Sequence, residues 1–178
     1  MKSISEKEAV RLLKKYASND ENFRGVLGHS KVVQKVALEI GMNVKDIDLE
    51  FIKSASLLHD IGRFEYGPGS KEAVKHGIAG AAILRKEGLP DYALVAERHL
   101  GAGISKEDIK EQKLELPLKD YLPVSKEEKI ITYADKLVFE EEIKSVEDAV
   151  SKFTKRFGER AGSRIKELGE EIGGMSKY

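Results

Sequence analysis

The chain has 178 residues, of which 40 % are hydrophobic and 35 % are charged, and its 31 Lys and Arg balance its 31 Asp and Glu. This length suffices for one domain with its own core, and the balanced charge provides no net field that would attract nucleic acid or a membrane surface. Because the chain has no cysteine, disulfides, zinc–thiolate sites and thiol nucleophiles are excluded.

No apolar run approaches the ~20 residues that a membrane-spanning helix needs. The first residues, MKSISEKEAV, lead into a charged helix and not into the apolar region of a signal peptide. We therefore predict a cytoplasmic protein without membrane contact. Abundant Lys and Glu with few Asn and Gln favour a thermophilic source.

The predicted elements are helices almost throughout. The pattern Ser5-x-x-Glu8 is a capping box that opens a first helix. Four further helices are predicted, for HSKVVQKVALEIGM, DLEFIKSASLLHD, AVKHGIAGAAILRKEG and PDYALVAERHL. The third has small residues that allow a neighbouring helix to approach closely. The fourth starts with a proline, which suits the first turn of a helix.

Two more capping patterns follow in the second half of the chain. Ser125-x-x-Glu128 opens the predicted helix KEEKIITYADKLVFEE, and Ser145-x-x-Asp148 opens helices over 145–172. Between them, residues 101–124 read as a long irregular loop, of the kind that often covers a site. No stretch alternates with period two, so we expect strands only as a short ribbon. The prediction is an all-α fold, with 1–178 as a single domain.

The four histidines carry the chemistry. Each lies in or beside a predicted helix among apolar or small residues: His29, His59, His76 and His99. A single such histidine is usually a core residue whose ring nitrogens are hydrogen-bonded within the protein. The segment SASLLHDIGR by itself also suits the C-terminus of a helix that is capped near Gly62. Four of them, with Asp60 and Asp135 in equally apolar settings, are costly to bury unless a metal ion pairs them.

The order His29 … His59-Asp60 … Asp135 resembles the HD superfamily of metal-dependent phosphohydrolases. LLHDIGR is similar to its central signature, HSKVVQKVA to its first-ligand helix and IITYADKLV to its last-ligand helix, so that the HD core covers about 25–140. The resemblance implies a helical bundle. HGIAGAAIL and AERHLGAGIS are similar to the segments that carry two additional histidines in two-metal members.

The resemblance implies two divalent transition ions, chosen among Fe, Mn, Co, Ni and Zn. The first ion is expected at His29, His59, Asp60 and Asp135, and the second at His76 and His99 with Asp60 as the bridge. A bridging water between the ions would act as a hydroxide-like nucleophile on phosphorus. A one-metal site, with His76 and His99 as phosphate contacts or general acids, stays open.

Three basic residues are candidate substrate contacts. Arg63 follows the central pair by one helical turn, and a guanidinium suits phosphate oxygens. Lys136 follows the last metal aspartate, and Arg98 precedes His99. We predict Asp60, Arg63 and Lys136 as catalytic residues and Arg63, Arg98 and Lys136 as substrate-binding residues. For each cation, a surface ion pair or a solvated position is the alternative.

The substrate expected from the resemblance is a nucleotide-like phosphate ester or anhydride. Among characterised subfamilies the chain is most similar to bacterial HD hydrolases of diadenosine tetraphosphate. The long gap between His99 and Asp135 departs from those and resembles small HDIG proteins with only a predicted hydrolase activity. The alternatives are a non-catalytic metal-stabilised module that binds a nucleotide or a partner, and a di-iron oxygenase. No nucleic-acid partner is expected, and a homodimer is left open.

Overall fold

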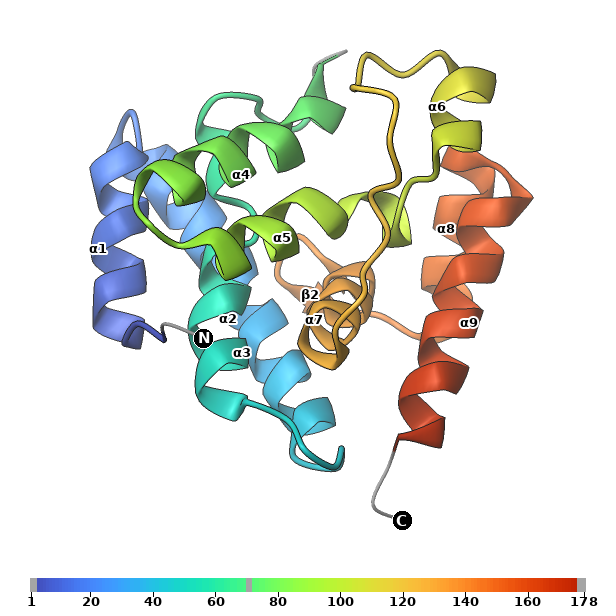
Figure 1. Cartoon of the computed structure of the whole chain (residues 1–178), viewed down its shortest axis with the longest axis horizontal. Helices are drawn as coiled ribbons and strands as arrows, with labels where there is room; N and C mark the ends of the chain where they lie inside the picture. Colours follow the sequence, from blue (N-terminus) through green and yellow to red (C-terminus); the bar gives the residue numbers. More distant parts are fainter. Residues whose placement is uncertain (1–2, 70–71, 176–178) are drawn as a thin grey trace.

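The computed structural model describes residues 3–69 and 72–175. Helices follow one another along the chain, with one hairpin near residue 140 (Figure 1). The α-helices are α1 (Glu6–Tyr16), α2 (Asp20–Gly41), α3 (Leu49–Leu58), α4 (His76–Lys86), α5 (Pro90–Arg98), α6 (Lys106–Gln112), α7 (Lys126–Lys136), α8 (Val146–Phe157) and α9 (Glu159–Gly174). Three 3₁₀ turns, η1 (Ile61–Phe64), η2 (Ala73–Lys75) and η3 (Leu100–Ala102), and the strands β1 (Val138–Phe139) and β2 (Glu142–Ile143) complete the described elements.

The prediction of an all-α fold with only a short ribbon is confirmed. Within the described ranges, the paired strands form a single antiparallel hairpin in which Val138 faces Ile143 and Phe139 faces Glu142. The single-domain prediction for 1–178 stays a prediction, and its residues 1–2, 70–71 and 176–178 lie outside the described residues. None of the described helices is both long and apolar enough to cross a membrane.

Side-chain caps start the helices where the sequence predicts them. Ser5 and Glu8 form both bonds of a capping box at α1. The Ser125 side chain accepts from the amide of Glu128 at α7, and Ser145 caps α8. These bonds satisfy amides that would otherwise lack partners in the first turn of each helix.

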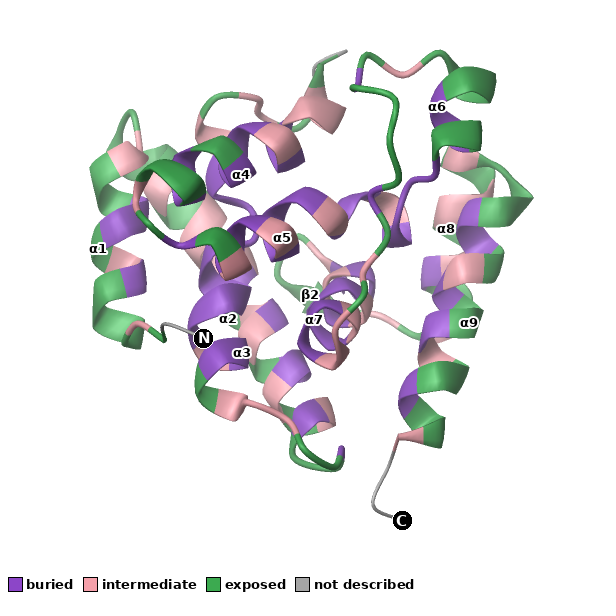
Figure 2. Cartoon of the chain, in the orientation of Figure 1, coloured by how far each residue is buried: buried purple, intermediate pink, exposed green. Residues whose placement is uncertain are grey.

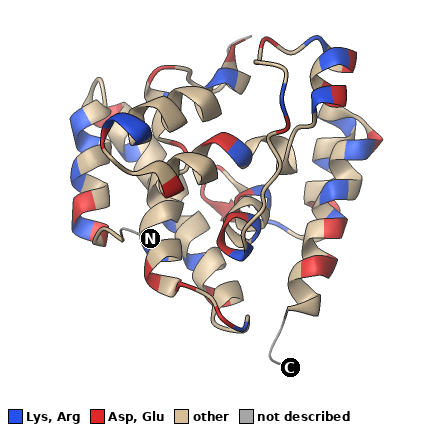
Figure 3. Cartoon of the chain, in the orientation of Figure 1, with Lys and Arg blue, Asp and Glu red and all other residues tan. Residues whose placement is uncertain are grey.

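The core lies between two groups of helices (Figures 1 and 2). Helices α1 to α5 form one side of the molecule, α8 and α9 form the opposite edge, and α7 stands between them. More than half of the residues in α3, α4, α5 and α7 are buried, whereas α1 and α9 each turn one face to solvent. Basic and acidic residues both occur along the outer helices α1 and α9 (Figure 3).

Two segments differ from the sequence prediction. The predicted helix KEEKIITYADKLVFEE ends at Lys136, and its last residues form strand β1 and the turn of the hairpin. The predicted 101–124 loop contains η3 and α6, the latter opened by a capping box between Ser105 and Asp108. This segment also builds a second hydrophobic cluster of Leu100, Ile104, Ile109, Leu116 and Tyr121. The small apolar cluster fixes the segment against the main body of the protein.

Candidate metal centre

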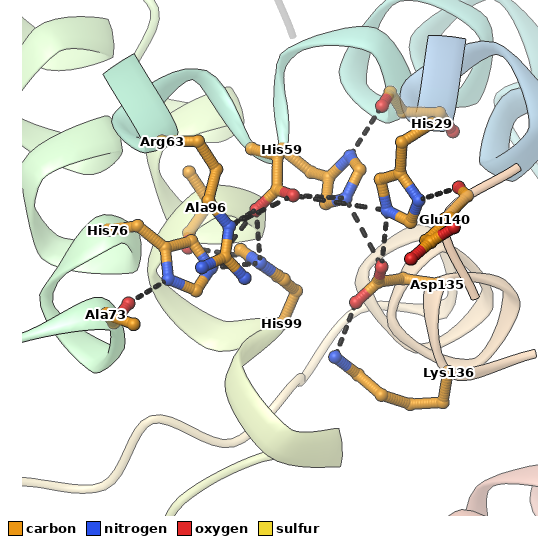
Figure 4. A network of polar contacts seen from close by, with 12 residues as sticks. His29, His59, Arg63, Ala73, His76, Ala96, His99, Asp135, Lys136 and Glu140 are labelled. Atoms are coloured by element: carbon orange, nitrogen blue, oxygen red, sulfur yellow. Dashed lines mark hydrogen bonds and ion pairs between the residues drawn. The ribbon is translucent and has the colours of Figure 1, made fainter. Parts of the chain in front are cut away.

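All six side chains predicted as metal ligands converge at one place in the interior (Figure 4). They come from distant parts of the chain. His29 lies in the middle of α2, His59 and Asp60 follow the end of α3, His76 begins α4, His99 follows the end of α5, and Asp135 lies in the last turn of α7.

Each histidine ring is oriented by a hydrogen bond to a backbone carbonyl. In all four, the Nδ1 atom lies 2.5–2.8 Å from a carbonyl oxygen and so donates its proton there. The acceptors are the carbonyls of Glu140 for His29, Ser56 for His59, Ala73 for His76 and Ala96 for His99. With Nδ1 protonated, the Nε2 atom of each neutral ring offers a lone pair, and such carbonyl bonds orient ligating histidines in metal sites.

The Asp60 carboxylate divides the four histidines into two pairs. Its Oδ1 atom lies 3.1 Å from Nε2 of His76 and 3.3 Å from Nε2 of His99. Its Oδ2 atom faces His29 and His59 at 4.0 and 3.9 Å. Asp135 Oδ1 completes the group of His29 and His59, 3.0 Å from His29 Nε2 and 3.5 Å from His59 Nε2. The assignment of one ion to each group stays a prediction.

The geometry of the nitrogens suits cations. Nε2 of His59 is buried and has no hydrogen-bond partner in the described part of the chain. Nε2 of His76 and Nε2 of His99 lie 3.0 Å apart, and two lone pairs facing each other at that distance repel unless a proton or an ion stands between them. His29, His59 and Asp135 form one group that could hold an ion, and His59, Asp60 and His99 another, with ligand atoms within 4.8 Å of one another. Imidazole and carboxylate together suit divalent transition ions.

Charges around the centre keep both carboxyl groups ionised. Burial would raise the pKa of Asp60, but Arg63 and the neighbouring histidines hold it well below its ordinary value. Burial would likewise raise the pKa of Asp135, which Lys136 and the histidines lower strongly. An ionised carboxylate is the form that binds a metal ion.

His29 and His99 differ in their pKa values. Burial favours the neutral ring of His29, but the hydrogen bond and the charge of Asp135 outweigh it and raise the pKa to about 9. For His99, burial dominates and lowers the pKa to about 4. His99 is therefore neutral at pH 7, as a metal ligand must be, whereas His29 must lose a proton when an ion binds.

Two glycines let the ligand segments approach each other. A Cβ atom on Gly62 would lie 1.9 Å from the carbonyl oxygen of His76 and 2.5 Å from the amide nitrogen of Gly80. A Cβ atom on Gly77 would lie 2.9 Å from the carbonyl oxygen of Ala96. The first contact joins η1 to α4 and the second joins α4 to α5. The sequence also allowed Gly62 to cap α3, but the C-cap of that helix is His59. Gly62 instead lets the central His-Asp pair lie close to His76.

The predicted substrate-binding cations occupy different positions. Nε of Arg63 lies 3.2 and 3.3 Å from the two Asp60 oxygens. Lys136 is 6 % exposed and its ammonium bonds to Asp135. Arg98 instead pairs with buried Glu128, at 3.0 Å, and lines neither cavity beside the centre. The predicted contact of Arg98 with substrate therefore has no support in this arrangement.

Two cavities adjoin the metal centre. One, of about 590 Å³, reaches His29, Asp60 and Asp135, and the other, of about 280 Å³, reaches His76. Arg63 and Lys136 line both. A substrate in either cavity would place a phosphate near the six ligands and near these two cations.

Sequence reasoning missed two contributions to the site. The carbonyl of Glu140, which orients His29, lies in a run that reads as a solvated acidic face; the structure places it at φ 58° in the hairpin turn. Lys152 and Phe153 of α8 line the larger cavity. Their helical spacing in AVSKFTKRF indicates an amphipathic helix, but no feature of the spacing shows which cavity its inner face covers.

Comparison with known proteins agrees with this arrangement. The family model described as HD domain matches residues 26–140. An uncharacterised protein of Methanocaldococcus jannaschii is 39 % identical over 177 residues, covering 96 % of this chain and 98 % of that protein. The tRNA (cytidine(56)-2′-O)-methyltransferases of Picrophilus torridus and Thermoplasma volcanium are 38 % and 33 % identical over 83 % and 92 % of this chain. The matches span only 41 % and 45 % of those two enzymes.

Solved structures show the same fold. The HD domain of the phosphodiesterase PgpH of L. monocytogenes superposes with a TM-score of 0.54 and 16 % identity, covering 93 % of this chain and 97 % of that one. The same domain in complex with cyclic-di-AMP superposes with a TM-score of 0.54 and 17 % identity, over 96 % and 98 % of the two chains. With the family model, the full-length relative and the converging His and Asp side chains in agreement, the chain belongs to the HD domain family.

Proposed function

We propose that this protein is a metal-dependent phosphohydrolase that cleaves a phosphate ester or anhydride in a nucleotide or dinucleotide. The observation that carries the proposal is the set of four Nε2 atoms, oriented by backbone carbonyls, that converge with two ionised carboxylates beside two cavities. In this assignment, His29, His59, Asp60 and Asp135 hold one ion, and His76, His99 and Asp60 hold a second.

Two divalent ions held by these residues would activate water as a nucleophile and neutralise charge on the phosphoryl oxygens. The chain supplies the positioning. Asp60 joins the two ligand groups through its separate oxygens. Arg63 and Lys136, which line both cavities, would bind the phosphate, because both present hydrogen-bond donors with a positive charge.

The named relatives guide the choice of substrates. A cyclic dinucleotide is bound by the HD domain of PgpH, so cyclic and linear dinucleotides belong in the assay. Two relatives are named as tRNA methyltransferases, and the chain matches less than half of their length. This match does not place methyl transfer in the shared region, but it makes tRNA a useful member of the panel.

The experiment combines metal analysis with turnover. The protein is purified without chelator, its metal content per chain is measured by plasma mass spectrometry, and phosphate or nucleotide release is followed with added Mn²⁺, Co²⁺ or Fe²⁺. The panel holds nucleoside monophosphates, cyclic and linear dinucleotides, diadenosine tetraphosphate and tRNA. We expect two transition ions per chain and turnover of one substrate class.

Other outcomes select the alternatives. One ion per chain with turnover supports the one-metal site, with His76 and His99 as phosphate contacts or general acids. Stoichiometric metal without release from any substrate contradicts hydrolysis and favours a binding module. Two iron ions with consumption of dioxygen, and no phosphate release, indicate oxygenase chemistry. Protein without metal would contradict the assignment of the centre itself.

A further inference from the structure

Helix α8 lies outside the residues that match the HD family model, yet it lines both cavities beside the metal centre. The model match ends at residue 140, and α8 begins at Val146. Phe153 is one of the residues common to the two cavities, together with Arg63 and Lys136. The identity of a substrate held there therefore depends on side chains that the family signature does not include.

One face of α8 points at the cavities. Lys152 and Phe153 line the larger cavity, and Phe153, Arg156 and Phe157 line the smaller one. Arg156 and Phe157 follow Phe153 by three and four positions, and residues with these separations lie side by side on a helix. Ala149, one turn before Phe153, is fully buried and seats the helix. The face offers aromatic rings and cations to the two cavities beside the metal centre.

Two arginines that line the smaller cavity, Arg156 and Arg164, differ in their contacts with the protein. Arg164 donates to the carbonyl of Gly103 and pairs with buried Asp108 at 2.6 Å. Arg156 has its guanidinium 5.0 Å from the centre of the Phe157 ring. Among the described residues, no carboxylate lies within ion-pair distance of Arg156. Arg156 is thus available to a ligand in the smaller cavity, whereas Arg164 is structural.

The rest of the smaller cavity is mostly apolar. Leu100 and Leu114 form part of its wall, and Gln112 adds an amide that can donate and accept hydrogen bonds. Its volume of about 280 Å³ is near the lower end of small-molecule pockets, roughly 300–1,000 Å³. An aromatic ring, a guanidinium and an amide around an apolar space are the groups that bind a planar nucleobase.

We propose that the cavity between α6 and α8 is a nucleobase subsite, in which Phe157 and Arg156 contact the base while the phosphate lies at the metal centre. The inference rests on the proposed phosphohydrolase function and adds the substrate's orientation: base towards α8, phosphate towards Arg63 and His76. Helix α8 would then determine which phosphate compounds the protein accepts.

The test compares ligands that differ only in the base. Metal-loaded protein is titrated calorimetrically with AMP, GMP, CMP and UMP and with ribose 5-phosphate, and ³¹P NMR shows whether any ligand is cleaved. Where a monoester is cleaved, the ratio of kcat/KM values replaces the ratio of Kd values. We expect at least one nucleotide to bind about tenfold more tightly than ribose 5-phosphate, the gain typical of stacking on one aromatic ring.

Variants on the same helix locate the effect. Phe157→Leu and Arg156→Gln should each reduce this preference towards one and leave the affinity for ribose 5-phosphate unchanged. Lys155→Gln is the matched control, because Lys155 is exposed on α8 and lines neither cavity, and it should keep the wild-type preference. Circular dichroism confirms that the variants are folded.

The possible results separate the two proposals. Equal binding of all nucleotides and ribose 5-phosphate by wild-type protein, or a preference that survives both substitutions, would overturn the subsite even if the protein is an active hydrolase. A base preference that Arg156→Gln removes supports the subsite even in a protein that releases no phosphate, in which case only the proposed hydrolysis fails.

Discussion

At the scale of single residues, the centre depends on which nitrogen of each histidine faces inwards. The carbonyl bonds at Nδ1 fix this for all four rings, and three of the acceptors lie only three residues before their histidine. The sequence identifies the ligand types and their order, but it does not show the tautomers or the division of the histidines between the two Asp60 oxygens, which follow from packing between distant helices.

Asp60→Ala should remove metal binding and activity together. Asp60 is the residue whose two oxygens face both pairs of histidines, so its loss weakens both ion sites at once. Metal per chain and turnover are measured on the same preparation. Asp91→Ala, in the half-buried first turn of α5 and outside both cavities, is the control and should resemble wild type. Full activity of Asp60→Ala would refute the site assignment.

His99→Ala should reduce the metal content from two ions to one. His99 and His76 face the same Asp60 oxygen, whereas the His29, His59 and Asp135 group does not include His99. Plasma mass spectrometry of the purified variant gives the count. If two ions remain, the ligands assigned to the second site are wrong; if none remains, the two sites are not independent.

At the scale of elements, helix starts were more predictable than helix ends. Caps such as Ser5 and Ser145 act within one turn, so sequence spacing reveals them. The end of α7 at Lys136 depends on the hairpin that follows, and α6 is a short helix held by a small cluster of its own. The capping box between Ser105 and Asp108 was visible in the sequence and would have identified α6.

Gly62→Ala should weaken both folding and metal binding. The added methyl group would meet the backbone of α4 at 1.9 Å, a contact that requires η1 and α4 to separate. Overpacking of this kind costs about 1–3 kcal/mol of unfolding free energy. Chemical denaturation and metal analysis check the two effects. Gly173→Ala is the control, since a methyl group there meets nothing within 4 Å and alanine favours the helix.

Glu97→Gln should destabilise the protein at neutral pH and not in acid. Glu97 is buried in α5 and pairs with Arg85 and Lys119, which ties the segment after α6 to the bundle. Burial would raise its pKa, but the two cations lower it below the ordinary 4.5. The ionised carboxylate therefore stabilises the fold above pH 4.5, and this contribution is lost as the pH falls through the lowered pKa.

Thermal unfolding of wild type and Glu97→Gln between pH 7 and pH 3 measures this effect. The difference in midpoint should be largest at pH 7 and should shrink below pH 4.5. Glu107→Gln, on the exposed first turn of α6, is the control. A difference that stays constant across this range would mean that the ion pairs do not account for the effect of Glu97.

At the scale of the whole molecule, the six candidate ligands come from α2, the end of α3, the start of α4, the end of α5 and α7. The sequence could predict that these segments meet, because the order of ligands resembles the HD family. It could not predict the position of α8 and α9, which follow the family's last ligand and pack on each other at the edge of the molecule. The cytoplasmic location stays a prediction, and a homodimer stays open.

Removal of metal should lower the stability of the entire fold. An ion bound only by the native state stabilises it by an amount that grows with concentration, about 2.7 kcal/mol at one hundred times Kd. Dialysis against EDTA should therefore lower the unfolding midpoint, and added Mn²⁺ or Co²⁺ should restore it. The Asp60→Ala variant should not respond to either treatment. An unchanged midpoint in wild-type protein would show that the ions do not connect these helices.

The local carbonyl bonds have a consequence for the rate of metal uptake. His59, His76 and His99 are held by carbonyls from their own helical turns, so folding of those turns places three ligands before any ion arrives. His29 instead relies on Glu140, far away in the chain. Opening of the hairpin would thus release one ligand from the first ion and leave the second pair of histidines in place. In the proposed two-metal centre, the ion at His29 should therefore exchange with solvent faster than the ion at His76 and His99.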